Sequence, residues 1–307
     1  MSHKQVLFDY LAFDFKYYDN GQLRFNDYCN FMKIGIEFAD VVTTVSKTYA
    51  KEIQTPEYGC NLDVILRYRN NDLYGIVNGI DTTSFDPKED KSIYHNYNIK
   101  NYIAGKKENK LSLQYQLGLK QDPDVMLVGM VSRLTFQKGA DLVLGAMSEM
   151  LKGNIQIAIL GTGESKYEYA FKMLEEGNKG RCVYYCGYNE ALAHQMYAGL
   201  DMLMMPSLFE PCGISQLISM RYGTLPFVRE TGGLKDTVIP YNEYTGEGTG
   251  FSFSRFDGYD MLKCIEYALE TYQNKKEDFK NLITQAMEKD VSWNHSADEY
   301  IDIYKSM

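Results

Sequence analysis

Short apolar runs alternate with helix-like segments through most of this chain, and this alternation constrains its fold more than any other feature. Between about residues 110 and 290, the runs VMLVGMVS, IQIAILG, RCVYYCG, DMLMMPS and LPFVRE have the length and composition of buried strands. The segments that follow them have helical spacing. Strands that alternate with helices form right-handed β-α-β units around a parallel sheet. The sequence therefore predicts an α/β fold with a Rossmann-like, doubly wound parallel sheet.

A shorter α/β pattern precedes this region. NFMKIGIEFAD at 30–40 has helical spacing, VVTTVS at 41–46 is a β-branched strand, and KTYAKEIQ continues as a helix. LYGIVNGID at 73–81 is typical of a strand that ends in an Asn-Gly turn. Residues 82–109 are polar and rich in Lys, Asp and Asn, which predicts an irregular connection. The closing SWNHSADEYIDIYKSM predicts a capped amphipathic helix.

Composition limits the class of protein. With 307 residues, 45% of them hydrophobic and 24% charged, the chain can bury the core of one large or two ordinary domains. A net charge of −9 disfavours a broad nucleic-acid surface, although it allows a small cationic pocket for a phosphate. Charges throughout the first 20 residues argue against a signal peptide, and no apolar run reaches the roughly 20 residues of a membrane span. Six cysteines without C-x-x-C spacing are typical of reduced thiols in a cytosolic protein.

Ligands of a doubly wound sheet bind beyond the carboxyl ends of its strands, so the residues at these ends are candidates for a site. Arg133 and Lys138 follow the first strand on one loop, where two cations can clamp a diphosphate. Two exposed surface charges are an equally good interpretation of their spacing alone. Tyr188 follows the third strand and can stack on a base, although a single aromatic side chain is weak evidence.

The second strand ends in Gly161-Thr162-Gly163, which resembles the start of a dinucleotide fingerprint. The third glycine of that fingerprint is missing, because Lys166 stands at its position, and no acidic residue is well placed on the following strand. We therefore predict a tight strand-to-helix turn here instead of an NAD site. No set of metal ligands is evident in the sequence, so we expect neither a metal nor a cofactor.

The fourth and fifth strands end in features that suit a sugar and a phosphate. Glu210 lies just before a helix predicted to begin near Gly213, where free N–H groups face the ligand. Its carboxylate can accept hydrogen bonds from sugar hydroxyls or stabilise a positive sugar centre, although it can also simply cap the helix. Thr231, Gly232 and Gly233 open the next helix and allow a phosphate to approach the backbone. Together, these strand ends indicate a sugar attached to a nucleoside diphosphate.

Several long motifs in the same order extend this interpretation. ADVVTTVSKTYAKEIQTPEYG, IVNGID, SRLTFQKGADLV, PSLFEPCGISQL and RYGTLPFVRETGGLKDTV closely resemble the bacterial glycogen synthase and plant starch synthase family, from about residue 20 to the C-terminus. The resemblance implies a GT-B fold, with two Rossmann-like domains around a cleft. It also implies transfer of glucose from ADP-glucose to the non-reducing end of an α-1,4-glucan, with retention and without a metal. The expected partners are ADP-glucose or ADP and the glucan, with no nucleic acid or membrane. The expected compartment is the cytoplasm, or a plastid-like compartment if the source is a plant.

The resemblance also assigns roles to the site residues. Arg133 and Lys138 match the diphosphate-binding pair of S-R-L-T-x-Q-K, and Glu210 matches the catalytic carboxylate of E-P-C-G. Cys212 and Gly213 match positions whose N–H groups meet the glucose hydroxyls. The catalytic set it implies is therefore Glu210, Arg133 and Lys138.

The remaining matches concern the nucleotide. Tyr188 matches the aromatic residue that stacks on adenine, and Ser215 stands where many members of the family have a threonine beside the phosphates. Thr231, Gly232 and Gly233 match the glycine turn near the diphosphate.

One departure from the family affects the expected activity. The Lys-x-Gly-Gly-Leu loop and the cleft histidine of the first domain have no counterpart here, and His3 lies too near the start to take that histidine's role. We therefore expect the rear part of a first domain at 1–88, a linker at 89–109, the nucleotide-sugar domain at 110–290, and a helix at 291–307 that packs back toward the N-terminal part. The chain alone is expected to be inactive. A binding fragment without turnover, and a GT-B enzyme that uses a UDP- or GDP-sugar, remain the alternatives.

Overall fold

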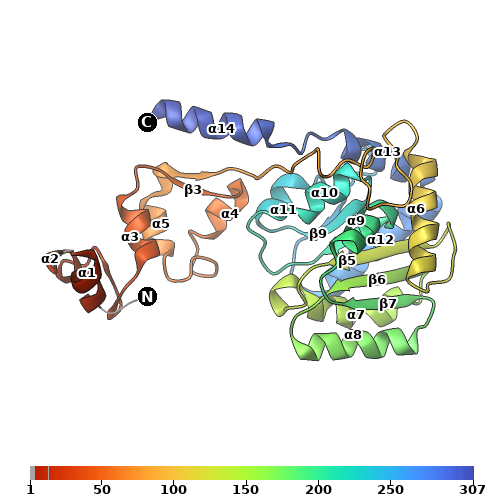
Figure 1. Ribbon diagram of the computed structural model, residues 1–307, viewed down its shortest axis with the longest axis horizontal. Helices are drawn as coiled ribbons and strands as arrows, with labels where there is room; N and C mark the ends of the chain where they lie inside the picture. The colour runs from red at the N-terminus through yellow and green to blue at the C-terminus, as the bar shows by residue number, and fades with distance from the viewer. Residues whose placement is uncertain (1–3, 13) are drawn as a thin grey trace. The chain divides into compact units, whose positions relative to one another are not determined.

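The computed structural model describes residues 4–12 and 14–307 and divides the chain into two units (Figure 1). One unit comprises the residues up to Ile76 together with Glu299–Met307, and the other comprises Val77–Asp298. We call them unit 1 and unit 2. The predicted boundaries at residues 88 and 110 differ from this division, because the whole predicted linker belongs to unit 2. His3 lies outside the described residues.

A six-stranded parallel sheet forms the centre of unit 2, and it confirms the predicted α/β fold class. The strands follow the order β10-β9-β8-β5-β6-β7. Their bounds are β5 Met126–Val131, β6 Ile155–Gly161, β7 Cys182–Cys186, β8 Met202–Met205, β9 Leu225–Arg229 and β10 Phe251–Phe253. Numbered within the unit, this is the 3-2-1-4-5-6 order of dinucleotide-binding folds. The chain reverses direction across the sheet between β5 and β8, so this strand pair marks the switch point where such folds bind ligands.

Helices cover both faces of the sheet, because right-handed crossovers run one way from β5 to β7 and the other way from β8 onward (Figure 1). Helix α7 packs beside α8 and α12, and α9 packs beside α6 and α10. The bounds in unit 2 are α6 Tyr102–Gln116, η2 Phe136–Lys138, α7 Ala140–Met150, α8 Ser165–Gly177, α9 Glu190–Gly199, α10 Ser215–Arg221, α11 Gly232–Thr237, α12 Gly258–Asn274 and α13 Lys276–Glu288. The helices predicted from residue 140 onward are thus present, and α12, α13 and β10 are additions.

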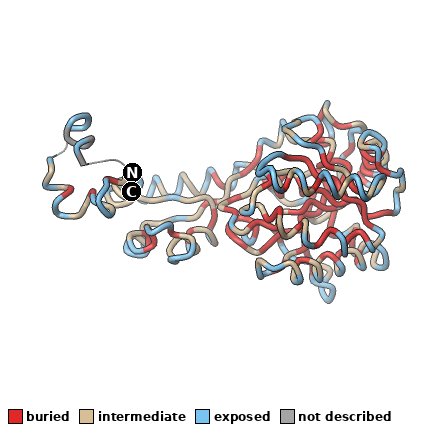
Figure 2. Tube along the Cα trace, turned by 90° about the horizontal axis from the view of Figure 1, so that it is seen from below, coloured by how far each residue is buried: buried red, intermediate tan, exposed pale blue. Residues whose placement is uncertain are grey.

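The central strands are apolar along their whole length because they are buried on both faces. Every residue of β6 is buried, and so is every residue of β5 except the last. Figure 2 shows that the buried residues concentrate in unit 2. This continuous burial explains why these strands are easy to recognise in the sequence.

Helix α6 corrects the prediction of an irregular connection up to residue 109. It begins at Tyr102, and its buried side is a stripe with helical spacing. Much of that stripe is polar, since Lys106, Asn109, Lys110 and Gln114 are all buried. Apolar periodicity, the usual signal of a packed helix, is therefore weak in this segment.

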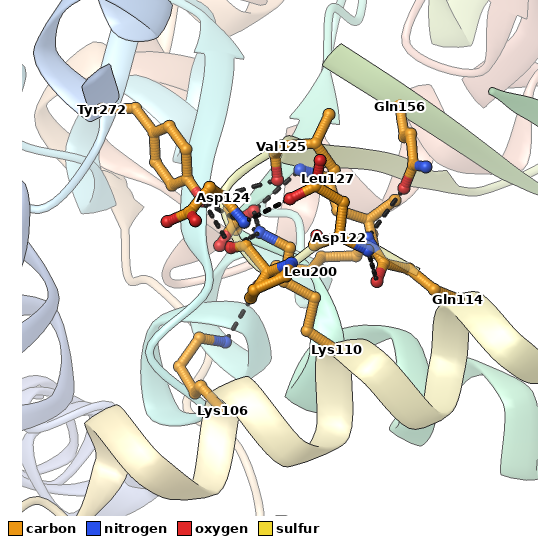
Figure 3. A network of polar contacts seen from close by, with 12 residues as sticks. Lys106, Lys110, Gln114, Asp122, Asp124, Val125, Leu127, Gln156, Leu200 and Tyr272 are labelled. Atoms are coloured by element: carbon orange, nitrogen blue, oxygen red, sulfur yellow. Dashed lines mark hydrogen bonds and ion pairs between the residues drawn. The ribbon is translucent and has the colours of Figure 1, made fainter. Parts of the chain in front are cut away.

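Figure 3 shows the two buried lysines of α6 with some of the groups that they contact. Lys110 Nζ lies 2.7 Å from Asp201 Oδ2, and it also donates to the carbonyl of Pro123 and to Tyr272 Oη. Lys106 Nζ donates to the carbonyls of Ala198, Leu200 and Tyr222 and to Thr224 Oγ1, so it binds carbonyls at the C-terminal ends of α9 and α10. Burial lowers the pKa of Lys106 to about 7, while the charge of Asp201 opposes this shift.

Unit 1 contains a small parallel pair of strands, β3 Val42–Thr44 and β4 Leu73–Gly75. The loop before α4 runs so close to β4 that a Cβ on Gly75 would lie 2.1 Å from the carbonyl oxygen of Ser46. The other bounds are α1 Lys4–Leu11, α2 Lys16–Asp19, β1 Arg24–Phe25, β2 Tyr28–Cys29, α3 Phe31–Phe38, α4 Lys47–Glu52, α5 Asp63–Tyr68 and η1 Asn70–Asp72. The predicted C-terminal helix is α14, Trp293–Ser306. Its last residues belong to unit 1, where Glu299 Oε1 lies 3.2 Å from Lys47 Nζ.

Two kinds of feature are absent from the residues that the structure describes. Within 4–12 and 14–307, no helix combines the length and the apolar character needed to cross a membrane. In the same part of the chain, no three His, Cys, Asp or Glu side chains are grouped so that they could hold a metal ion.

Candidate active site

Two loops meet at the switch point of the sheet, one after β5 and one after β8. The N–H of Leu208 donates to the carbonyl of Gln137 at 2.8 Å, and Gln137 Nε2 donates to the carbonyl of Phe209 at 2.6 Å. Gly139 allows this contact, because its φ is +74° and a Cβ there would lie 2.2 Å from the carbonyl oxygen of Pro206. The local sequence thus holds the loop that carries Lys138 against the loop that carries Glu210.

Lys138 and Glu210, both predicted site residues, are in direct contact. Lys138 Nζ donates to Glu210 Oε2, and Ser207 Oγ donates to the same oxygen at 3.0 Å. The side chains are 19% and 10% exposed, so this ion pair is shielded from water yet open on one side. A cation and a carboxylate in such a place can interact strongly with a charged ligand.

Arg229 of β9 holds the loop that leads to Glu210. Its guanidinium is buried and donates to the carbonyls of Ser207 and Leu208, in the loop that leads to Glu210, and to the carbonyl of Ser254. A buried arginine bound to three carbonyls holds that loop in one geometry. This role was not predicted from the sequence, although a charge inside the apolar run LPFVRE was a signal for it.

Two adjoining cavities open over these loops. The larger, about 370 Å³, is lined by Tyr188 and Arg133, and the smaller, about 220 Å³, by Lys138, Glu210 and Arg133. Ser215, the first residue of α10, lines both cavities and accepts a hydrogen bond from Tyr197 Oη at 3.3 Å. Five of the predicted site residues therefore line one or both of these adjoining cavities.

The predicted glycine turn lies behind Glu210 instead of lining either cavity. Gly233 N donates to the carbonyls of Glu210 and Pro211, at 3.0 and 3.1 Å. A Cβ on Gly232 would lie 2.0 Å from the carbonyl oxygen of Glu210, and Thr231 is fully buried. In this structure the turn anchors the main chain of the E-P-C-G segment, and its predicted contact with a diphosphate stays a prediction.

Cys212 and Gly213 also lie outside the walls of the two cavities. Cys212 is buried, and burial raises the pKa of its thiol. Gln216 Nε2 donates to the carbonyls of both residues, at 3.0 and 3.1 Å. Gly213 has a φ of +72°, which suits glycine at this bend before α10. The helix begins two residues later than predicted, at Ser215.

The Gly161-Thr162-Gly163 turn has a structural reason for its glycines. A Cβ would lie 1.9 Å from the carbonyl oxygen of Ser132 at Gly161, and 2.1 Å from that of Leu134 at Gly163. The N–H of Gly163 donates to Glu168 Oε1 at 2.8 Å, so a carboxylate of the chain occupies this donor. Both observations agree with the predicted tight turn.

Replacing Lys138 with alanine is expected to weaken the binding of ADP much more than the binding of adenosine. A shielded, charge-assisted contact to a phosphate contributes about 1.5–3 kcal/mol, which is roughly 10- to 150-fold in affinity. Calorimetric titration of both ligands measures the difference, and Lys152, an exposed cation paired with Glu149, provides the control K152A. An equal loss for ADP and adenosine would place Lys138 away from the phosphates.

Two protein-family models match this chain. The family described as "Starch synthase catalytic domain" matches residues 1–68, and "Glycosyl transferases group 1" matches residues 117–286. A glycogen synthase of Clostridium beijerinckii is 49% identical over 303 residues, which is 99% of this chain and 63% of that protein. The chain therefore spans about three fifths of the length of this relative.

Solved structures are also similar to this chain. The catalytic domain of starch synthase IV from Arabidopsis thaliana, bound to ADP and acarbose, matches with a TM-score of 0.87 and 36% identity, over 93% of this chain and 59% of that one. Anabaena Alr3699/HepE in complex with UDP-glucose matches with a TM-score of 0.62 and 16% identity, over 89% of this chain and 66% of that one, and shows the shared fold. The chain belongs to the group 1 glycosyl transferases, and it is similar to glycogen and starch synthases.

Proposed function

We propose that this chain carries the donor-binding half of a glucosyltransferase. The enzyme transfers glucose from ADP-glucose to the non-reducing end of an α-1,4-glucan, glycogen or starch, with retention. The observation that carries the proposal is the meeting of Arg133, Lys138 and Glu210 at the switch point between β5 and β8. Its support also includes the similarity to glycogen synthases and to a starch synthase structure that holds ADP and acarbose.

The two cavities suit the two parts of such a donor. The nucleoside is assigned to the larger cavity, where the 86% exposed ring of Tyr188 is free to stack on a base. The diphosphate lies where both cavities share Arg133 and Ser215, and the glucose lies in the smaller cavity beside Glu210. Arg133 has no ion pair among the described residues, so it is available to a phosphate.

The chemistry follows from these positions. The C1–O bond between glucose and diphosphate breaks, and its electron pair stays on the diphosphate oxygen. A C1–O bond to a hydroxyl oxygen of the acceptor forms, and the proton of that hydroxyl passes to the leaving diphosphate. Negative charge that develops on the leaving diphosphate is stabilised by Arg133 and Lys138. The carboxylate of Glu210 stabilises the positive charge that develops on the sugar. Lys138 contacts Glu210 in the free site, so we expect its ammonium to turn toward the diphosphate when the donor binds.

We propose neither a metal nor another cofactor for this site. The two cations, Arg133 and Lys138, neutralise the negative charge that a divalent ion would otherwise neutralise. The proposal includes no nucleic acid or membrane partner. The proposed compartment is the cytoplasm, or a plastid-like one, which suits six cysteines that all carry free thiols.

Metal-free nucleotide binding is the first test. We expect calorimetry in EDTA to detect ADP binding to this chain. UDP and GDP should bind with lower affinity than ADP. Added Mg²⁺ should change the affinity little. Binding that requires Mg²⁺ would contradict the metal-free site, and tighter binding of UDP or GDP would favour a different nucleotide sugar.

Transfer of labelled glucose from ADP-glucose to glycogen extends this test. The matched preparations are this chain alone and a fusion with the part of the Clostridium beijerinckii glycogen synthase that it does not match. We expect transfer from the fusion and none from the chain alone, because closure of a second domain over the donor expels water. Incorporation by the chain alone would contradict the assignment of half a site, and a nucleotide-binding fusion without transfer would contradict the proposed reaction.

A further inference from the structure

The segment that follows Val77 contributes one residue, Phe85, to the lining of the larger cavity. Phe85 of this segment and His194 of α9 both line it, and their rings stack with centroids 5.0 Å apart and planes 21° apart. Glu190, Ala193 and Tyr197 line the cavity from the same side of α9. A histidine in the second turn of this helix therefore lies within the space assigned to the nucleoside.

A buried carboxylate fixes the orientation of this imidazole. Asp90 Oδ2 lies 2.7 Å from His194 Nδ1 and accepts a hydrogen bond from Tyr222 Oη at 2.5 Å. The N–H of Ser92 donates to Asp90 Oδ1 at 2.8 Å. Burial acts to raise the pKa of Asp90, but the hydrogen bonds from Tyr222 and His194 outweigh it and lower that pKa. Asp90 is therefore a carboxylate that only accepts hydrogen bonds, so Nδ1 of His194 carries the hydrogen.

The other ring nitrogen is left for a ligand. In a neutral imidazole whose Nδ1 is protonated, Nε2 is a hydrogen-bond acceptor. Among residues 4–12 and 14–307, no group bonds to Nε2 of His194, and this atom is not among the polar atoms sealed in the interior without a partner. His194 lines the larger cavity, which is the space that a ligand of Nε2 would occupy.

We propose that His194 is a specificity-determining residue of the nucleoside pocket. Its Nε2 accepts a hydrogen bond from an N–H or O–H donor of the nucleoside, while Asp90 holds the tautomer and Phe85 holds the plane of the ring. The inference rests on the proposed function, since that function places the nucleoside in this cavity. The donor is the exocyclic amine of the base or a hydroxyl of the ribose.

Two amide variants distinguish the role of Nδ1 of His194 from the role of Nε2. In His194→Asn the amide nitrogen occupies the place of Nδ1 and keeps Asp90 bonded, but nothing replaces Nε2. In His194→Gln the longer side chain brings an amide oxygen near the place of Nε2. We expect the asparagine variant to bind both ADP and adenosine about 3- to 10-fold more weakly, and the glutamine variant to recover part of that loss. Lys138→Ala should affect ADP alone, which separates the nucleoside contact from the phosphate contact.

Nucleotide analogues identify the donor group. Inosine diphosphate lacks the exocyclic amine, and the 2′- and 3′-deoxy forms of ADP each lack one ribose hydroxyl. The analogue without the relevant donor should bind the wild-type chain 3- to 10-fold more weakly than ADP, and His194→Asn should weaken it no further. If His194→Asn weakened the binding of all three analogues as much as it weakens the binding of ADP, the inference would be overturned.

NMR of the wild-type chain gives a readout that needs no folded asparagine variant. Long-range ¹H–¹⁵N spectra should show His194 protonated at Nδ1, and its Nε2 resonance should move when adenosine is added. Protonation at Nε2 in the free chain, or unchanged affinity in His194→Asn, would overturn the proposal. A wild-type chain that binds ADP while the His194 variants bind equally well contradicts this inference alone. A wild-type chain that binds no ADP contradicts the proposed function itself.

Discussion

Glutamine in place of Glu210 is expected to lower the turnover of glucosyl transfer by about 10²–10³-fold, the usual cost of removing one electrostatic contact to a transition state. Glutamine keeps the shape of the side chain and can still accept from Ser207 Oγ, but it removes the negative charge beside the sugar. The same change releases Lys138 from its ion pair, so ADP should bind as tightly as before or more tightly. An effect on turnover without loss of nucleotide affinity marks an interaction made mainly in the transition state.

The measurement pairs transfer kinetics with ADP calorimetry in the fused protein described above. Glu230→Gln is a matched control, because Glu230 follows β9, bonds to Ser252 Oγ at 2.8 Å and lines neither cavity. This control should leave both quantities near wild type. If Glu210→Gln weakened ADP as much as it lowered turnover, Glu210 would be a binding residue only.

Alanine in place of Asp201 is expected to destabilise unit 2 by about 3–5 kcal/mol, the typical cost of removing one partner of a buried ion pair. Lys110 is 4% exposed, and without Asp201 its ammonium keeps, among the residues that the structure describes, only the carbonyl of Pro123 and Tyr272 Oη as hydrogen-bond partners. Asp201 Oδ2 also accepts from the N–H of Leu127 in β5, at 2.7 Å, so the change leaves a second buried donor without its acceptor.

Urea unfolding followed by circular dichroism measures this loss. Glu149→Ala is the control, because Glu149 pairs with Lys152 on the surface and exposed pairs contribute little. Adding Lys110→Met to Asp201→Ala should recover part of the stability, since it removes the unpaired charge. A loss no larger than that of Glu149→Ala would show that water or another group replaces the carboxylate.

The sequence predicted the strands of unit 2 well because burial on both faces leaves a strong local signal, as in MLVGMV and IQIAILG. The part of helix α6 before residue 110 carried no such signal. The buried positions of the helix include Lys106, Asn109 and Lys110, whose partners lie in other elements. A buried polar stripe has the spacing of a packed helix but the composition of a loop, and only tertiary contacts distinguish the two.

The residues of the candidate site were likewise predicted only in part. Arg133, Lys138 and Glu210 were found because strand ends of a doubly wound sheet converge, and the structure brings them to one cleft. Asp90 and His194 were missed, because they lie 104 positions apart and Asp90 sits in a stretch predicted to be an irregular connection. The contacts of Cys212, Gly213 and Thr231–Gly233 with a ligand remain predictions, since these residues support the Glu210 loop from behind.

The strand order also has a consequence for synthesis on the ribosome. β5 pairs early with β6, but its other neighbour, β8, begins only at Met202. Until β8 has emerged, one side of β5 is an apolar edge with unpaired backbone groups, which is a template for aggregation. The nascent chain thus carries this open edge at the place where its ligand site later forms. Conditions that slow translation between β7 and β8 should therefore increase the fraction of chains that need chaperones.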